Sequence, residues 1–151
     1  MEPQKKEGRY SRIYNQLEGL FTKTDNTEAR MATVIAVLHH KMDYFFWTGF
    51  YCLYQDELVV RNYQGPVACQ VLEKNKGVCW AGINLGETIV VKNVHDFPGH
   101  IACDSRSNSE IVVPIRNKQG RIFGVLDVDS KELASFDETD AVWLEKIVGM
   151  I

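Results

Sequence analysis

Residues 110–129 read Glu-Ile-Val-Val-Pro-Ile-Arg-Asn-Lys-Gln-Gly-Arg-Ile-Phe-Gly-Val-Leu-Asp-Val-Asp, and this stretch decides the fold class. Apolar and β-branched residues fill both halves, and the polar segment Asn117-Lys118-Gln119-Gly120 separates them. This order is typical of two antiparallel strands joined by a turn. We therefore predict a β-hairpin with strands at residues 110–116 and 121–129.

Amphipathic helices are expected at both ends of the chain, where apolar residues recur with helical spacing. The first is expected at residues 10–21, and the third opens at residues 136–140. The second begins at Asp25, whose carboxylate would cap the first turn, with Glu28 completing a capping box. The expected buried faces are Ile13, Leu17, Leu20 and Phe21; Met31, Val34, Ile35 and Leu38; and Ala141, Leu144, Val148 and Ile151.

Aromatic and β-branched runs predict three further strands, at residues 45–54, 58–63 and 88–91. Gln55-Asp56 is expected to form the tight turn between the first two. The middle of the chain, residues 65–109, is expected to be mostly loop, and its content of Cys, His, Trp and Phe argues against disorder. Helices at both ends around antiparallel strands predict one α+β domain over residues 1–151, with a pocket between sheet and loops.

Composition limits the classes of function. The chain has 151 residues, a formal charge of −3 and a 45% apolar fraction, which is typical of an ordinary globular domain. Nothing in that charge favours nucleic acid or an anionic membrane as a partner. No run approaches the roughly 18 apolar residues of a membrane span, and residues 1–8 do not resemble a signal peptide. We therefore expect a cytoplasmic protein, in which four cysteines indicate catalysis or metal binding rather than structural disulfides.

Three of these cysteines, Cys69, Cys79 and Cys103, lie in the expected loop region. Cys103 follows Phe-Pro-Gly-His-Ile-Ala, and a thiol in such a loop, with two others nearby, indicates thiolate and disulfide chemistry. The alternative is that the cysteines are small core residues, as we expect for Cys52. We expect no metal site, because there is no Cys-x-x-Cys and the cluster of His95, His100 and Cys103 lacks paired ligand spacing.

Two strands carry candidate pocket residues. Alternation places Trp47, Gly49 and Tyr51 on one face of the first strand, where the glycine would leave a notch for a ligand or mark a bulge between core aromatics. Phe123, Val125, Asp127 and Asp129 share a face of the last strand. Its two carboxylates, with Glu110, would hold a ligand ammonium or a protonated oxygen, or would face solvent. His95 is expected to be structural, and the role of His100 stays open.

Several motifs together resemble the free methionine-(R)-sulfoxide reductases, a family of stand-alone GAF domains. The resemblance implies a six-stranded antiparallel sheet with helices on one side and the pocket on the other. It covers most of the chain, and a general GAF sensor domain would lack this set of three cysteines. The matching segments are residues 46–51, 64–69, 77–79, 96–104, 107–114 and 124–130.

The resemblance also implies a function: reduction of the R-sulfoxide of free methionine without a bound cofactor. Cys103 would be the nucleophile and Cys69 the preferred resolving cysteine, with Cys79 as a second thiol able to exchange. The implied reductant is thioredoxin, supplied by NADPH and thioredoxin reductase, and a homodimer would be common for a GAF domain. Trp47 and Tyr51 would form a wall against the methylthio end of the substrate. The implied holders of its ammonium and sulfoxide oxygen are Glu110, Asp127 and Asp129.

One residue departs from the family pattern, in which Gly-Val-Cys is followed by glycine, whereas here Trp80 follows Cys79. This change bears on the role of Cys79 and of its loop. Both pairings, Cys69–Cys103 and Cys79–Cys103, stay open, as does the choice of proton-donating carboxyl. The alternative function is a GAF domain that senses a small molecule and uses its cysteines as redox switches.

Overall fold

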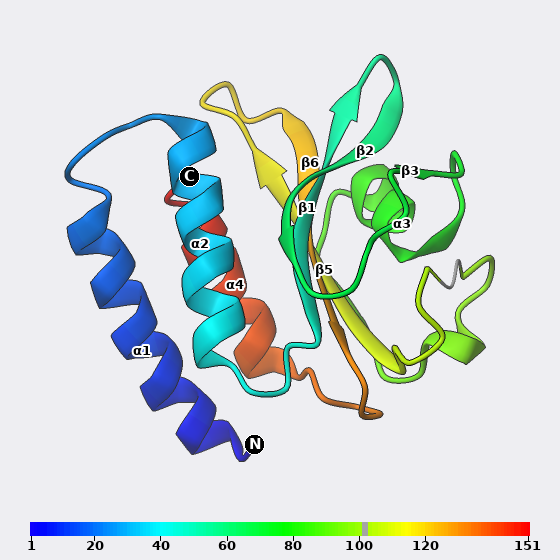
Figure 1. Ribbon diagram of the computed structural model, residues 1–151, viewed down its shortest axis with the longest axis horizontal. Helices are drawn as coiled ribbons and strands as arrows, with labels where there is room; N and C mark the ends of the chain where they lie inside the picture. Colours follow the sequence, from blue (N-terminus) through cyan, green and yellow to red (C-terminus); the bar gives the residue numbers. More distant parts are fainter. Residues whose placement is uncertain (101–102) are drawn as a thin grey trace.

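The computed structural model describes residues 1–100 and 103–151 and contains one antiparallel sheet (Figure 1). Its six strands lie in the order β3-β2-β1-β6-β5-β4, with each neighbouring pair antiparallel. This order confirms the predicted α+β class. The strands are β1 (Trp47–Tyr54), β2 (Glu57–Gln64), β3 (Val71–Leu72), β4 (Ile89–Val91), β5 (Ser109–Arg116) and β6 (Ile122–Ser130).

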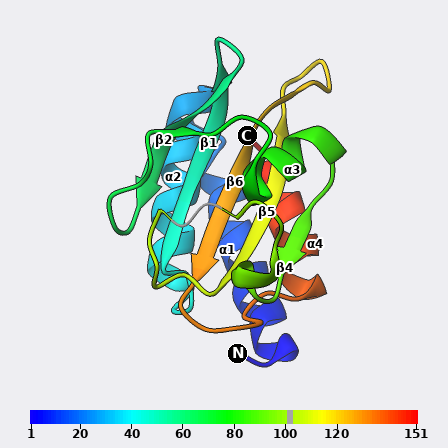
Figure 2. The same cartoon turned by 90° about the vertical axis from the view of Figure 1, so that its right-hand side faces the viewer.

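Helices cover both faces of the sheet. Three of them, α1 (Pro3–Leu20), α2 (Thr27–Lys41) and α4 (Glu138–Val148), lie on one face. The other face carries α3 (Gly77–Leu85), a 3-10 helix (Val94–Asp96) and the long connections, which stand in front of the sheet in Figure 2. No helix in the described part of the chain is both long and apolar enough to cross a membrane.

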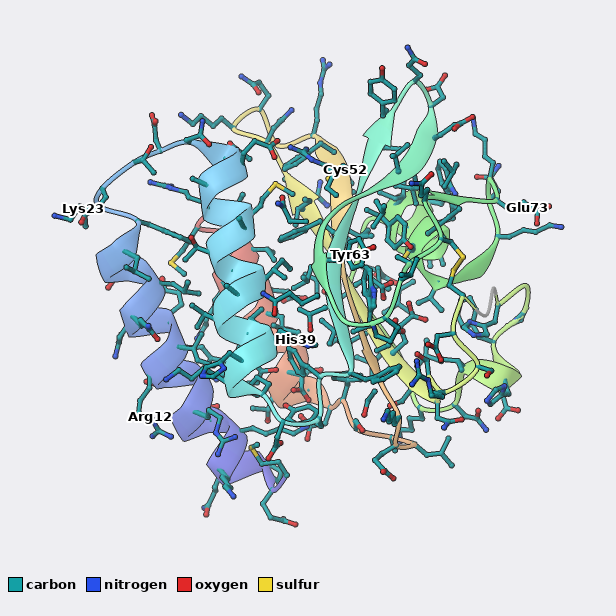
Figure 3. All side chains as sticks on the ribbon, viewed as in Figure 1. Arg12, Lys23, His39, Cys52, Tyr63 and Glu73 are labelled. Carbon is teal, nitrogen blue, oxygen red and sulfur yellow. A yellow bond between two sulfur atoms is a disulfide. The ribbon has the colours of Figure 1, made fainter. Side chains whose placement is uncertain are left out.

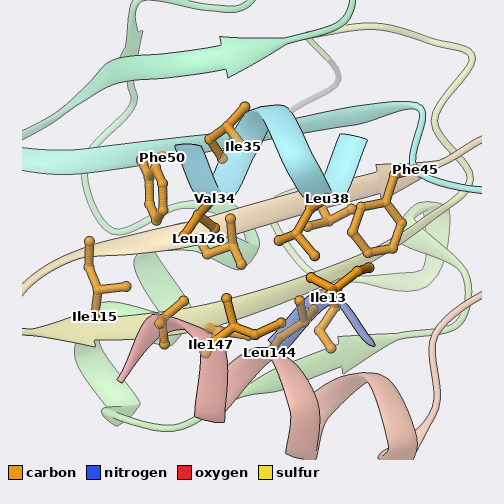
Figure 4. Packing of buried hydrophobic residues seen from close by; sticks show 14 of the residues in the cluster. Ile13, Val34, Ile35, Leu38, Phe45, Phe50, Ile115, Leu126, Leu144 and Ile147 are labelled. Carbon is orange, nitrogen blue, oxygen red and sulfur yellow. The ribbon is translucent and has the colours of Figure 1, made fainter. Parts of the chain in front are cut away.

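The larger hydrophobic core fills the space between the sheet and the three helices (Figure 4). Leu38, Leu126 and Leu144 come from α2, β6 and α4, and each is fully buried. Burial of one such side chain contributes roughly 1.5–3 kcal/mol, so this layer holds the helices to the sheet. Cys52 belongs to this core, as predicted.

The predicted helices exist, but two of their starts were wrong. The first helix begins at Pro3, a residue that suits a helix start, and it exposes Leu20, which was expected to be buried. The cap of α2 is Asn26 and not Asp25, because the Asn26 side chain accepts a hydrogen bond from the Ala29 amide at 2.9 Å. The buried face predicted for α2 is confirmed.

A buried ion pair explains why the first helix extends to Pro3. Lys6 Nζ lies 2.5 Å from Asp140 Oδ2 at the start of α4, and the two side chains are 2% and 0% exposed. The hydroxyls of Tyr10 and Tyr44 donate to the other oxygen of Asp140, at 2.6 and 2.5 Å. Asp140 also accepts from the Asp137 amide and completes the capping box of α4. This network fixes the first helix against the last.

Most of residues 65–109 lies outside helices and strands, as expected, but the prediction missed α3 and β3, which lie within this range. The helix is only nine residues long, and it contains glycine at two positions, so its sequence shows little helical periodicity. Gly82 has a packing role: a Cβ there would lie 2.8 Å from Val112 Cγ1. The missing side chain allows α3 to approach the sheet closely.

Strand alternation was correct for β1 and for most of β6. Phe123 is the exception, since it packs against the helix-side core and not on the face of Val125. The β5–β6 register shifts between Ile115 and Arg116, and such a bulge changes the face to which the following side chains point. From Val125 to Asp129 the predicted alternation holds, and it places both aspartates on the face opposite the three helices.

Candidate active site

A pocket opens on the α3 side of the sheet. Its walls come from the start of β1, the connection from β2 to β3, the start of α3, and the segment that follows the 3-10 helix. Of the eight site residues proposed from the sequence, seven line this one pocket, and the eighth, Cys69, is bonded to one of them, Cys103. The residues that line it directly are Trp47, Tyr51, Cys79, Cys103, Glu110, Asp127 and Asp129.

Cys69 and Cys103 form a disulfide, with their Cα atoms 5.6 Å apart, so one of the two open pairings is present (Figure 3, yellow bond). Cys103 is exposed and Cys69 half-buried, so the bridge lies near the surface. Cys79 remains a free thiol, buried on the first turn of α3. Its pKa is raised, first by burial and then by the neighbouring carboxyl groups. A buried thiol that resists ionisation is a poor nucleophile, whereas an accessible one reacts.

Aromatic side chains form the wall beside the disulfide. The rings of Trp47 and Tyr51 stack with centroids 5.8 Å apart, and Tyr63 stacks on the other side of Trp47 at 5.3 Å. Tyr51 donates its hydroxyl hydrogen bond to the Cys69 carbonyl at 2.8 Å, which ties the wall to the disulfide. The expected notch at Gly49 is not open, because a Cβ there would lie 2.5 Å from the Trp47 ring.

Carboxyl groups occupy the sheet side of the pocket. Glu110 on β5 is the direct cross-strand partner of Asp129 on β6, and Asp129 in turn faces Trp47 on β1. Asp127 lies two residues before Asp129 on the same face, and both Asp127 and Glu110 are 5% exposed. Neither these two nor Asp129 belongs to any ion pair among the described residues. The solvent-facing alternative is therefore wrong for Glu110 and Asp127.

Burial dominates the electrostatics of these acids. It raises the pKa of Glu110, and Asp127 and Asp129 raise it further. Burial likewise raises the pKa of Asp127 and of Asp129. Carboxyl groups crowded in a water-poor site keep their protons because the charged forms are poorly solvated and repel one another. The pocket thus combines a disulfide at its mouth with buried carboxylic acids that can donate protons.

Comparison with known proteins places the chain in a family. The model of the GAF domain family matches residues 28–151. GAF domain-containing protein A of Dictyostelium discoideum is 46% identical over 147 residues, which are 97% of this chain and 92% of that protein. The free methionine-R-sulfoxide reductase of Escherichia coli is 34% identical over 142 residues, or 94% of this chain and 86% of that protein.

Comparison with solved structures agrees with the comparison of sequences. The X-ray structure of free methionine-R-sulfoxide reductase from Neisseria meningitidis, in complex with its substrate, has a TM-score of 0.88 and 42% identity, covering 93% of this chain and 84% of that one. The chain belongs to the free methionine-R-sulfoxide reductase family of GAF domains. This membership confirms the resemblance drawn from the cysteine set and the strand motifs.

Trp80, the residue that departs from the family pattern, does not line the pocket. Trp80 is 4% exposed and packs in the second core cluster, with its indole nitrogen 3.5 Å from the Leu72 carbonyl. The ring therefore braces α3 against β3, while Cys79, its neighbour, faces the pocket.

Several lining residues were not predicted as site residues. Asp104 follows Cys103 directly, and hydrogen bonds from Arg106 lower its pKa to about 2. His100 also lines the pocket, and burial followed by the nearby His95 lowers its pKa. His95 is structural, as predicted: its Nε2 lies 3.0 Å from Asn108 Oδ1. The closeness of Asp104 and His100 to Cys103 in sequence was the feature from which their place in the pocket could have been predicted. Residues 101 and 102, which directly precede Cys103, lie outside the described residues.

Proposed function

We propose that this chain reduces free methionine-R-sulfoxide to methionine, with Cys103 as the nucleophile. The observation that carries the proposal is the placement of the Cys69–Cys103 disulfide at the mouth of a pocket that contains buried carboxylic acids. The disulfide is the product expected after one catalytic cycle. Family membership supports the substrate, since the Escherichia coli and Neisseria meningitidis relatives carry that substrate in their names.

The first step transfers the sulfoxide oxygen to Cys103. A carboxylic acid of the Glu110, Asp127 and Asp129 group protonates the oxygen, which makes the sulfoxide sulfur electrophilic. The thiolate of reduced Cys103 attacks, the sulfur–oxygen bond of the substrate breaks, and methionine leaves while Cys103 becomes a sulfenic acid. The raised pKa values of the three acids support this step, because a proton donor must be protonated at neutral pH.

The second step forms the disulfide. The Cys69 thiolate attacks the Cys103 sulfenic acid, a sulfur–sulfur bond forms, and the oxygen leaves as water. Tyr51 supports this step, since its hydrogen bond to the Cys69 carbonyl holds the attacking residue at the pocket wall. Overall, two thiols lose two electrons and the sulfoxide gains them.

An external dithiol must then restore the thiols. We propose thioredoxin, kept reduced by NADPH and thioredoxin reductase, and a cytoplasmic location follows from that partner. The exposed position of Cys103 supports access by such a protein. Within the pocket, Trp47 and Tyr51 would contact the methylthio group, and an ionised member of the acid group would bind the substrate ammonium.

A single-turnover experiment tests this proposal. Reduced enzyme freed of reductant should convert about one equivalent of free methionine-R-sulfoxide per chain, measured as methionine released. Cys103→Ser should release none, whereas Cys69→Ser should complete this first turnover but cycle slowly with thioredoxin. Cys52→Ala is the matched control, because Cys52 lies in the helix-side core. Retention of the single turnover by Cys103→Ser would remove Cys103 as the nucleophile.

A further inference from the structure

Beside the disulfide, the pocket contains a cluster of three buried side chains, one of which, Cys79, has no role in the proposed reaction. Cys79, Glu110 and Asp127 come from α3, β5 and β6, and a ligand atom of each lies within 4.8 Å of those of the other two. All three side chains are about 95% buried. Sequence reasoning passed over this set because its members are far apart in the chain and lack metal-ligand spacing.

One atom of the group has no partner. Asp127 Oδ1 is buried and receives no hydrogen bond from the described residues. Buried carboxyl oxygens are normally satisfied by a donor or a cation, and leaving one unpaired costs about 1–3 kcal/mol. No described lysine or arginine pairs with Asp127 or Glu110. Within the described residues, no side-chain cation therefore lies against this group, and Asp127 Oδ1 is free to bind one.

We propose that Cys79, Glu110 and Asp127 bind a zinc ion, which competes with the substrate for this pocket. The thiol decides the metal: sulfur ligands favour zinc, whereas magnesium and calcium are bound by oxygen ligands alone. Zinc bonds of about 2.3 Å to sulfur and about 2.0–2.2 Å to carboxylate place two ligands roughly 3.5 Å apart. Small side-chain movements bring atoms now within 4.8 Å into one such shell.

Three protein ligands leave one coordination position open toward the pocket, as in zinc sites that exchange their fourth ligand. The thiol proton leaves to solvent when zinc binds, as is general for cysteine ligands. Cys79 is free while Cys69 and Cys103 are joined, so the site exists in the oxidised protein. The ion would bind Glu110 and Asp127, to which we also assign the substrate, so zinc and substrate would compete. This competition rests on the proposed function.

Cobalt is a suitable probe, because a thiolate bound to Co²⁺ absorbs in the near ultraviolet. Chelator-treated protein with its disulfide intact is titrated with Co²⁺, and Zn²⁺ is then added to displace it. We expect one Co²⁺ per chain with a thiolate band, loss of this band in Cys79→Ser, and its retention in Cys52→Ala. Cys52 is the matched control, since it is the other free buried thiol of the oxidised chain.

A second variant covers the case in which Cys79→Ser does not fold. Glu110→Gln keeps the thiol and should weaken zinc binding at least tenfold, the loss typical of even outer-shell changes at zinc sites. Absence of a thiolate band in folded wild-type protein, or its persistence in Cys79→Ser, would overturn the site. Free methionine-R-sulfoxide should displace the metal. Zinc that binds but resists displacement would support the site and argue against the assigned substrate position, whereas normal turnover without zinc binding would refute the site alone.

Discussion

Glu110→Gln should stabilise the protein at neutral pH while abolishing turnover. Glu110 is 5% exposed, and burial followed by Asp127 and Asp129 raises its pKa well above the ordinary value. In the unfolded chain a glutamate ionises near pH 4.3, so above that pH the folded state holds a proton that the unfolded state has lost. A group with a raised folded-state pKa contributes its full stability below its unfolded pKa, and that contribution is lost as pH rises toward the folded pKa.

One such proton changes the unfolding free energy by about 1.4 kcal/mol per pH unit. Over the pH range between the unfolded and the folded pKa of Glu110, the wild-type protein should therefore lose stability through this group at up to this slope. Glutamine keeps the shape and removes the titration. The unfolding free energy of the variant should therefore rise relative to that of the wild type as pH increases through this range. The three acids are close neighbours, so the variant reports the loss of one proton from a coupled set.

Urea unfolding followed by tryptophan fluorescence measures this difference at three pH values, with the disulfide kept intact in both proteins. Glu57→Gln on β2 is the control, because Glu57 is an exposed glutamate and should leave the wild-type pH slope unchanged. Parallel slopes for wild type and Glu110→Gln would show that Glu110 is ionised in the folded protein. That result would refute the raised pKa of Glu110 and would exclude Glu110 as the proton donor among the three acids.

Two further predictions concern stability. Gly49→Ala should cost about 1–3 kcal/mol in urea unfolding, because its Cβ would lie 2.4 Å from a neighbouring side chain, whereas Gly19→Ala, with open space around it, should be neutral or stabilising. An unchanged midpoint for Gly49→Ala would contradict the tight aromatic packing. Lys6→Met should cost about 3–5 kcal/mol, since it leaves a buried carboxylate unpaired, while exposed Lys5→Met should have little effect. Equal midpoints for the two lysine variants would show that the ion pair does not hold the first helix.

Side-chain alternation made the pocket face of the sheet predictable. Trp47, Tyr51, Asp127 and Asp129 follow the period of two in strands that pair regularly, so their shared face could be derived from sequence alone. The same rule failed at Phe123, because Phe123 is the extra residue of a bulge, and a bulge depends on how two strands pair and leaves no local sequence signal. The predicted cap of α2 was wrong because Asp25 and Asn26 are adjacent and both are good caps, so residue type alone does not distinguish them.

The parts of the site that depend on distant contacts were less predictable. Helix α3 is short, contains glycine and is apolar on several sides, so it lacks the periodicity by which helices are found. The pairing of Cys69 with Cys103 joins residues 34 positions apart and came from the family resemblance, not from spacing. The grouping of Cys79 with Glu110 and Asp127 requires α3 to lie against β5 and β6, which only the fold reveals.

The most direct test of the account is NADPH consumption with thioredoxin and thioredoxin reductase. Three substrates should be compared at equal concentration: free methionine-R-sulfoxide, free methionine-S-sulfoxide and a peptide that contains methionine sulfoxide. We predict turnover with the free R epimer alone, and loss of that turnover in Cys103→Ser. If folded protein with reduced thiols consumes no NADPH with any of the three substrates, the proposed reductase activity is contradicted. A GAF domain that senses a small molecule would then be favoured.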